Sequence, residues 1–132
     1  MKLITRDTDY AVRILKAIAL KETKQATAAG LSKELGIPLS YVRKLLQALG
    51  KKGPLRSYTG KGGGFELSRP ADKITLGEIA SLFQGQVCFT ECLFKKKPCP
   101  ERGRCAMRSK LRDIEALVAS KLDGVTLASL MK

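Results

Sequence analysis

The chain has 132 residues, of which 44% are apolar and only 5% are aromatic, so we expect one domain with an aliphatic core and an appended helix. Twenty-five Lys and Arg residues against twelve Asp and Glu give a formal charge of +13, and no histidine occurs. Such a charge indicates an anionic partner, namely DNA, RNA or a membrane surface. A cysteine nucleophile generally needs a basic partner such as histidine, so the chain is not expected to be an enzyme.

The N-terminal stretch "MKLITRDTDYAVRILKAIALKET" carries charged residues along its length and has no uninterrupted apolar run. A signal peptide and a membrane-spanning helix both need such a run, so we expect no membrane partner. The expected compartment is the cytoplasm, where disulfides are scarce.

The first half of the chain predicts a helix-turn-helix. Apolar residues at helical spacing predict an amphipathic helix over about 7–22, and "TAAGLSKELGIPLSYVRKLLQALGKKG" predicts two shorter helices. Gly36 is expected to end the first of these, and Ser40 to cap the second. Two short helices joined by a tight turn, the second with a basic outer face, are typical of this motif. An ordinary helical hairpin with a solvated polar face is the alternative.

The next stretch, "LRSYTGKGGGFELSR", predicts a β-hairpin with a glycine-rich tip. A basic hairpin directly after a helix-turn-helix indicates a winged helix, whose wing can follow phosphates or enter the minor groove. The predicted fold class is therefore mainly α with a small β-hairpin wing, and the expected partner is double-stranded DNA. The residues expected to contact DNA are Ser40, Tyr41, Arg43, Lys44, Arg56, Lys61, Gly62 and Gly63.

After the hairpin, "KITLGEIASLFQG" predicts another helix, which Gly85 ends. The segment to Cys105 contains lysines, two prolines and a glycine, and is expected to be a loop. A last helix over about 105–122 carries an apolar stripe of Met107, Leu111, Ile114, Val118 and Leu122, and Gly124 ends it.

The stripe on this last helix has two possible partners: the core of its own domain, or the same helix of a second chain. A homodimer would read two half-sites together. The expected organisation is a winged helix-turn-helix over 1–85, a cysteine-rich loop over 86–105, and a dimerisation helix with a C-terminal tail over 106–132.

All four cysteines lie in one segment, at positions 88, 92, 99 and 105. Their separations of three, six and five residues match neither a paired zinc knuckle nor a bacterial ferredoxin run. Four soft ligands among several lysines and arginines suit zinc or an iron–sulfur cluster. Free thiols, or a disulfide formed only in air, are the alternative.

The chain as a whole resembles the Rrf-type winged-helix transcription regulators, which include iron–sulfur sensors of the IscR and NsrR kinds. The resemblance is carried by "MKLITRDTDYAVRIL", "GIPLSYVRKLLQALGKKG", "GKGGGFELSRPADKITLGEIASLFQG" and the long C-terminal helix. It implies a DNA-binding regulator whose cluster senses redox state, nitric oxide or cluster supply. A DNA-binding regulator with a purely structural zinc or a free-thiol redox site is the alternative.

The same resemblance implies a ligand set, in which Cys92, Cys99 and Cys105 hold the cluster. IscR-like members supply a histidine a few residues past the last cysteine, but Arg108 stands there in this chain. NsrR-like members use an aspartate of the first helix from the partner subunit, and Asp9 falls at that place. Cys88 is the alternative fourth ligand. A 2Fe–2S cluster is favoured as the common family type, and the lack of histidine leaves a 4Fe–4S cluster open.

Overall fold

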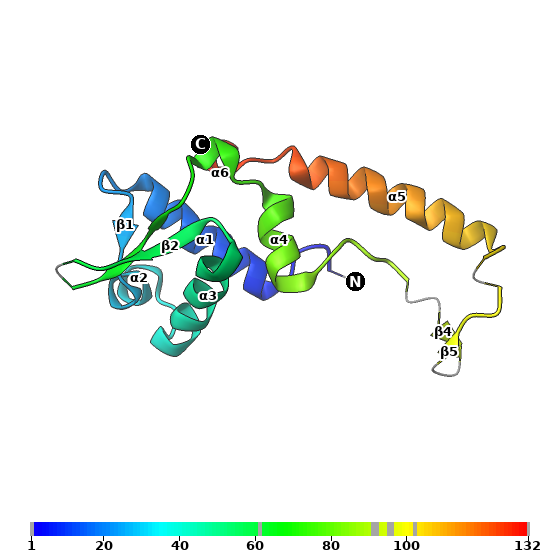
Figure 1. Cartoon of the computed structure of the whole chain (residues 1–132), viewed down its shortest axis with the longest axis horizontal. Helices are drawn as coiled ribbons and strands as arrows, with labels where there is room; N and C mark the ends of the chain where they lie inside the picture. Colours follow the sequence, from blue (N-terminus) through cyan, green and yellow to red (C-terminus); the bar gives the residue numbers. More distant parts are fainter. Residues whose placement is uncertain (1, 61, 91–92, 95–96, 102, 132) are drawn as a thin grey trace.

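The computed structural model describes residues 2–60, 62–90, 93–94, 97–101 and 103–131. Figure 1 shows a head of packed helices and strands, from which one long helix and the cysteine-bearing segment project to one side. The elements in chain order are α1 (Arg6–Leu20), β1 (Gln25–Ala26), α2 (Ala28–Leu35), α3 (Leu39–Lys52), β2 (Leu55–Tyr58), β3 (Gly64–Leu67), the 3-10 helix η1 (Ala71–Lys73), α4 (Leu76–Gln84), β4 (Leu93–Phe94), β5 (Lys97–Pro98), α5 (Ala106–Asp123) and α6 (Leu127–Leu130).

The predicted helix-turn-helix is present as α2 and α3. Thr27 caps α2, because its Oγ1 accepts a hydrogen bond from the backbone N–H of Gly30 at 3.0 Å. Gly36 ends α2 with a φ of 68°, the left-handed conformation that costs glycine little. The apolar faces of both helices pack against α1. This packing leaves the opposite face of α3 on the surface of the head.

The predicted wing is an antiparallel hairpin of β2 and β3, in which Leu55 lies opposite Leu67 and Tyr58 lies opposite Gly64. A third strand, β1, pairs with the other side of β3, so the sheet order is β1-β3-β2. No strand was expected at 25–26. Together, the mostly helical head and the small antiparallel sheet confirm the predicted fold class.

The hydrophobic core is aliphatic, as the composition predicts. It lies between α1, α2, α3 and α4 and is closed by α6 (Figure 1). Its largest fully buried side chains are Ile14, Leu15, Ile18, Leu31, Val42, Leu45, Leu46, Leu49, Leu55, Ile74, Ile79 and Leu127.

After α5 the chain returns to the head. The backbone N–H of Leu76 donates to Val125 O, and that of Leu127 donates to Ile74 O, each at 2.8 Å. These bonds flank an antiparallel bridge between Thr75 and Thr126. The return matters for the site, because it anchors α5 at its C-terminal end while its N-terminal end, next to Cys105, lies far from the head (Figure 1).

Three local predictions need correction. Ser40 is not the cap of α3: the helix begins at Leu39, and the carbonyl of Pro38 already accepts bonds from Tyr41 N and Val42 N at 3.0 Å. The first helix ends at Leu20, not at 22, because the next residue is extended. The segment 86–105 is not wholly irregular, since β4 and β5 form a short antiparallel pair within it.

The described residues contain no helix with the length and apolar character that a bilayer crossing requires.

Candidate nucleic-acid interface and cysteine site

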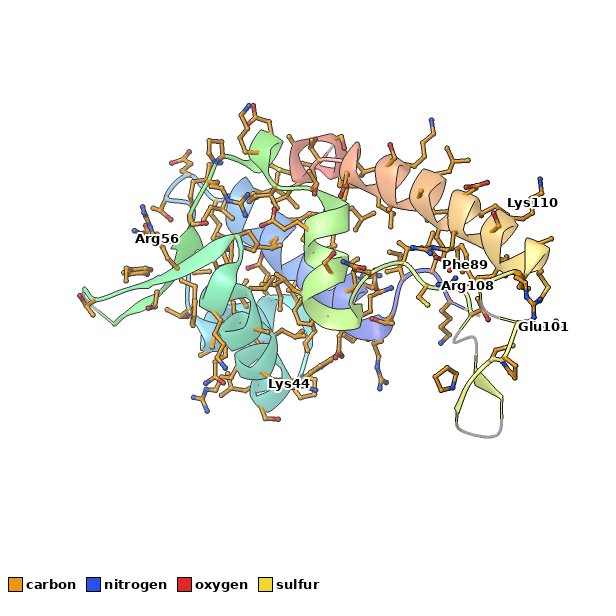
Figure 2. All side chains as sticks on the ribbon, turned by 45° about the vertical axis from the view of Figure 1, so that its right-hand side comes forward. Lys44, Arg56, Phe89, Glu101, Arg108 and Lys110 are labelled. Carbon is orange, nitrogen blue, oxygen red and sulfur yellow. The ribbon has the colours of Figure 1, made fainter. Side chains whose placement is uncertain are left out.

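The outer face of α3 carries the residues that were expected to read DNA. Ser40, Arg43 and Lys44 are exposed. Val42, which precedes Arg43, and Leu45, which follows Lys44, are fully buried. The burial on one face fixes the helix in the head and therefore fixes the direction of the exposed face. Figure 2 shows Lys44 on α3 and Arg56 on the wing, both on the head and away from the projecting α5.

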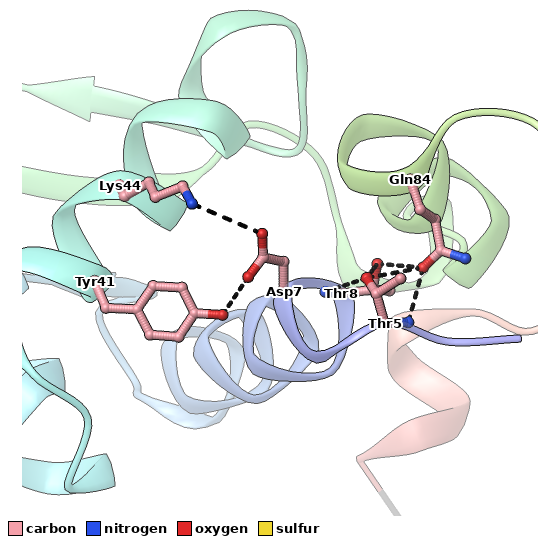
Figure 3. A network of polar contacts seen from close by, with 6 residues as sticks. All are labelled: Thr5, Asp7, Thr8, Tyr41, Lys44 and Gln84. Atoms are coloured by element: carbon pink, nitrogen blue, oxygen red, sulfur yellow. Dashed lines mark hydrogen bonds and ion pairs between the residues drawn. The ribbon is translucent and has the colours of Figure 1, made fainter. Parts of the chain in front are cut away.

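Tyr41 and Lys44 both contact Asp7 of α1 (Figure 3). The Tyr41 hydroxyl donates to Asp7 Oδ1, and Lys44 Nζ lies 3.9 Å from Asp7 Oδ2. Burial, with a further contribution from the Asp7 hydrogen bond, raises the pKa of Tyr41 to about 12, so the phenol keeps its proton. The Tyr10 ring packs edge-on against the Tyr41 ring at 5.6 Å. The first turn of α3 is thus fastened to the first turn of α1.

The wing brings Arg56 beside Glu66 of the facing strand. Arg56 Nε donates to Glu66 Oε1 at 3.0 Å, and Gln25 Nε2 of β1 donates to Glu66 Oε2 at 3.1 Å. These bonds lower the pKa of Glu66, the Gln25 bond most, so the carboxylate stays charged. The Arg56 side chain is still 64% exposed and remains accessible to a phosphate.

The tip of the wing is built on glycine. Gly62 and Gly63 have φ angles of 85° and 59°, which L side chains rarely adopt. The turn closes through a bond from Gly63 N to Gly60 O at 3.0 Å. Lys61 lies outside the described residues, so its predicted DNA contact stays a prediction.

The cysteine segment leaves the head after α4 and ends at α5. Cys88 is exposed, whereas Cys99 and Cys105 are half-buried, and these three are free thiols. Cys92 lies outside the described residues. Within the part of the chain that is described, no three His, Cys, Asp or Glu residues come close enough to form a metal site.

Cys105 has the best-defined surroundings of the described cysteines. It is the N-cap of α5, and its sulfur accepts a hydrogen bond from the backbone N–H of Arg108 at 3.4 Å. No acidic residue occurs in the first turn of this helix. A helix N-terminus favours negative charge, so this position suits a thiolate ligand. By donor chemistry, a set of sulfur ligands on this segment fits zinc or an iron–sulfur cluster.

Asp9 lies on α1 and faces solvent. Its Oδ2 accepts from Arg13 Nε at 3.1 Å, one helical turn further on, and its side chain is 49% exposed. The guanidinium of Arg13 lies 6.0 Å from the centroid of the Tyr10 ring. An exposed ion pair of this kind is weak, so Asp9 is accessible to another chain.

The space between α4, α5 and the start of the cysteine segment is a cavity of about 620 Å³. Gln84, Cys88 and Arg112 contribute to its lining. At its edge the backbone N–H of Phe89 donates to Glu115 Oε1 on α5 at 2.8 Å. The segment is therefore attached to α5 beyond its covalent connection, and Phe89 lies beside this helix in Figure 2.

The predicted stripe on α5 is only partly covered by the head. Leu122 at its C-terminal end is 9% exposed, but Met107 is 68% and Ile114 is 48% exposed. Leu117, which the stripe did not include, is 60% exposed. An apolar face of this size on a projecting helix is typical of a helix that packs against another chain.

Asp7 and Gln84 were not identified from the sequence. A carboxylate in the first turn of a helix is favoured for its own sake, so nothing in the sequence marks Asp7 as a partner of α3. Gln84 is the last residue of a predicted helix, and its partners lie 76 to 81 residues earlier in the chain.

A helix-turn-helix with an exposed basic face, followed by a hairpin wing, defines a winged-helix DNA-binding protein. Residues 4–132 match the Rrf2 family, described as an iron-dependent transcriptional regulator. The chain is 34% identical over 132 residues to the HTH-type transcriptional regulator IscR of Aliivibrio salmonicida (strain LFI1238), covering 99% of this chain and 77% of that protein. It belongs to the Rrf2 family and is a transcription regulator, not an enzyme.

Solved structures agree with this fold. CymR of B. subtilis superposes with a TM-score of 0.76 at 23% identity, covering 99% of this chain and 97% of that one. T. potens IscR gives a TM-score of 0.74 at 21% identity, with coverages of 99% and 86%.

Proposed function

We propose that this regulator carries an iron–sulfur cluster on the segment 86–105 and that the state of the cluster sets its affinity for operator DNA. The observation that carries the proposal is Cys105, a half-buried thiol at the N-terminus of α5. The iron-dependent description of the family and the relatives named IscR support it. When bound, the cluster supplies a centre that oxidants or nitric oxide alter.

The proposed ligands are Cys92, Cys99 and Cys105, with Asp9 of the partner subunit as the fourth. Cys88 is the alternative fourth ligand. Asp9 is favoured because its carboxylate lies on a helix of the head and, among the described residues, is held by an exposed ion pair with Arg13. We propose a 2Fe–2S cluster, and the alternative 4Fe–4S cluster would contain twice the iron and sulfide per site.

The proposed active form is a homodimer that pairs the exposed faces of α5. Dimerisation supplies Asp9 of the partner subunit and places two α3 helices on two half-sites of duplex DNA. The proposed contacts in the major groove come from Ser40, Tyr41, Arg43 and Lys44. Arg56 and the wing tip, which comprises Lys61, Gly62 and Gly63, are proposed to hold the backbone or the minor groove.

Anaerobic purification followed by iron and sulfide analysis tests the cluster. We expect brown protein with visible absorption, which Cys99→Ala loses while the protein stays folded. Cys88→Ala is the matched control and keeps the absorption if Asp9 is the fourth ligand, whereas Asp9→Ala loses it. Colourless protein with one zinc per chain would overturn the proposal in favour of a structural zinc site.

The link to DNA needs its own measurement. Affinity for a duplex selected from a randomised pool is compared between cluster-loaded and cluster-free protein at one salt concentration. We expect the two forms to differ. Equal affinities would leave a winged-helix regulator that does not sense the state of its cysteines.

A further inference from the structure

Gln84, the last residue of α4, uses both ends of its side-chain amide on the N-terminal segment. Its Oε1 accepts from Thr5 N at 3.0 Å and from Thr8 Oγ1 at 2.7 Å, and its Nε2 donates to Leu3 O at 2.7 Å. A fourth contact of this amide runs from Thr5 Oγ1 to Gln84 Oε1 at 3.2 Å. One side chain therefore fastens the end of α4 to the start of α1.

The contact with Thr8 lies in the interior. Among the described residues, Thr8 is the one fully buried polar side chain. Its hydroxyl donates to Gln84 Oε1 at 2.7 Å and lies 3.2 Å from Thr5 Oγ1. If Gln84 moved away, this buried hydroxyl would lose the shorter of these two contacts, and the loss of a buried hydrogen bond is costly. The end of α4 and the first turn of α1 are thus expected to move together.

The same turn of α1 holds the recognition helix. Asp7 lies between Thr5 and Thr8, and its carboxylate accepts from the Tyr41 hydroxyl of α3 (Figure 3). The view shows the first turn of α1 between two partners, Gln84 on α4 and Tyr41 on α3. The route from Gln84 to α3 therefore consists of hydrogen bonds on either side of the first turn of α1, joined by the backbone of that turn.

The cysteine segment begins directly after Gln84 in the chain. Gly85 follows with a φ of 74°, a conformation suited to glycine, and Cys88 comes three residues later. Gln84 and Cys88 line the same cavity against α5. A displacement of the cysteine segment is therefore expected to displace the C-terminal end of α4, where Gln84 lies.

We propose that Gln84 is a positioning residue for DNA recognition: through Thr5, Thr8 and Asp7 it conveys the arrangement of the cysteine segment to Tyr41 and the recognition helix. This inference rests on the proposed function, because it assigns the route by which the state of the cysteine segment changes DNA affinity. It requires two arrangements of the α4 end, of which cluster-loaded and cluster-free protein favour different ones.

The structural half of the proposal is tested without cluster or DNA. Tyrosine labelled with ¹³C at Cζ gives one NMR signal for each of Tyr10, Tyr41 and Tyr58, and Tyr41→Phe assigns the Tyr41 signal. We expect Gln84→Ala to move this signal toward its position in Asp7→Ala. Gln86→Ala, an exposed glutamine two residues away, is the matched control and should leave it in place. A Tyr41 signal that does not respond to Gln84→Ala overturns the proposal.

Two further variants separate positioning from a loss of folding. Gln84→Glu keeps the acceptor for Thr5 N and Thr8 Oγ1 but loses the donor to Leu3 O, so the Tyr41 signal should move less than in Gln84→Ala. Thr8→Val removes the buried hydroxyl at nearly constant shape and should act in the same direction as Gln84→Ala. A Tyr41 signal that moves as far in Gln84→Glu as in Gln84→Ala, or that stays in place in Thr8→Val, would contradict the assigned route.

The regulatory half of the proposal is tested by a ratio of DNA affinities, that of cluster-loaded protein to that of cluster-free protein. Both affinities are measured on the duplex selected with the unaltered chain. Gln84→Ala should bring this ratio about 2- to 30-fold closer to one, the range for residues that carry coupling between sites. Cluster content should be unchanged. An unaltered ratio overturns the proposal. If the unaltered chain itself has a ratio of one, the proposed function fails, while the Tyr41 signal still decides whether Gln84 positions α3.

Discussion

Lys44 and Asp7 face each other between α3 and α1, with Lys44 Nζ 3.9 Å from Asp7 Oδ2. The Lys44 side chain is 71% exposed, so this ion pair is a weak one. A DNA phosphate can therefore replace Asp7 as the partner of Lys44 at little cost. The Tyr41–Asp7 hydrogen bond does not depend on that exchange.

Lys44→Ala is expected to weaken binding to all duplexes about equally, because a lysine that contacts phosphate carries no sequence information. The slope of log affinity against log salt should become shallower by about 0.9, the value for one phosphate contact on B-DNA. Fluorescence anisotropy over a salt series measures both. Lys110→Ala on α5 removes the same charge away from α3 and serves as the control. A loss confined to the selected operator would show instead that Lys44 reads a base.

Arg43→Ala, unlike Lys44→Ala, should weaken binding to the selected operator more than binding to a random duplex. The side chain is exposed on α3 and can present its planar fork to a guanine in the major groove. We expect a loss of about 1–3 kcal/mol on the selected operator and a much smaller loss on a random duplex. Competition binding at fixed salt gives both values. Equal losses on the two duplexes would mean that Arg43 contacts only phosphate.

Leu117→Asp is expected to convert the proposed dimer into a monomer, because it places a charge in the exposed apolar face of α5. Sedimentation velocity measures the change. The head should stay folded, since Leu117 is 60% exposed and does not belong to the core. A variant that still sediments as a dimer would show that dimerisation uses another surface.

Gly77→Ala should destabilise the contact between α4 and α5. A Cβ at this position would lie 2.0 Å from Asp123 Oδ1 and 3.2 Å from the Asp123 backbone nitrogen. We expect a loss of about 1–3 kcal/mol in the free energy of unfolding, measured by urea denaturation. Adding Asp123→Ala removes the nearest clash and should restore part of the loss. Additive effects of the two changes would contradict this geometry.

The raised pKa of Tyr41 predicts that the stability of the fold depends on pH in the alkaline range. Its pKa is raised from 10.0 to about 12, so the folded chain holds this proton more tightly than the unfolded chain. The stabilisation is fully present below pH 10 and is lost as the pH rises toward 12. The difference in Tm between the unaltered chain and Tyr41→Phe should therefore shrink above pH 10. A constant difference from pH 8 to pH 11.5 would show that burial and the Asp7 bond do not raise the pKa of Tyr41.

The sequence predicted the helix-turn-helix and the wing because each depends on local signals. Gly36 marks the end of α2, and the glycines of the hairpin tip mark its turn. It did not predict β1 or the return of residues 125–131 to the head. Both depend on pairing with distant strands or loops, Gln25 with Glu66 and Thr75 with Thr126, which no local pattern specifies.

The residues of the candidate site also fall into those that local sequence patterns identify and those that depend on distant partners. Exposed residues on α3, such as Arg43, follow from helical periodicity and were identified. Asp7 and Gln84 act through partners in other elements, so their roles appear only once α1, α3 and α4 are packed. The division of the chain at 85 and 105, the cluster ligands and the DNA contacts remain predictions.

The return of the chain after α5 makes the region 86–124 an insertion in the head. In the described part of the chain, no member of the core cluster comes from residues 86–126, whereas Ile74 and Leu127 on either side are both fully buried. The course of this region can therefore change, with the proposed effect on Gln84 and Tyr41, while the aliphatic core of the head stays packed. A variant in which a short linker replaces residues 86–124 should still fold as an independent head. The proposed sensing by the cysteines could then be studied separately from the binding of DNA.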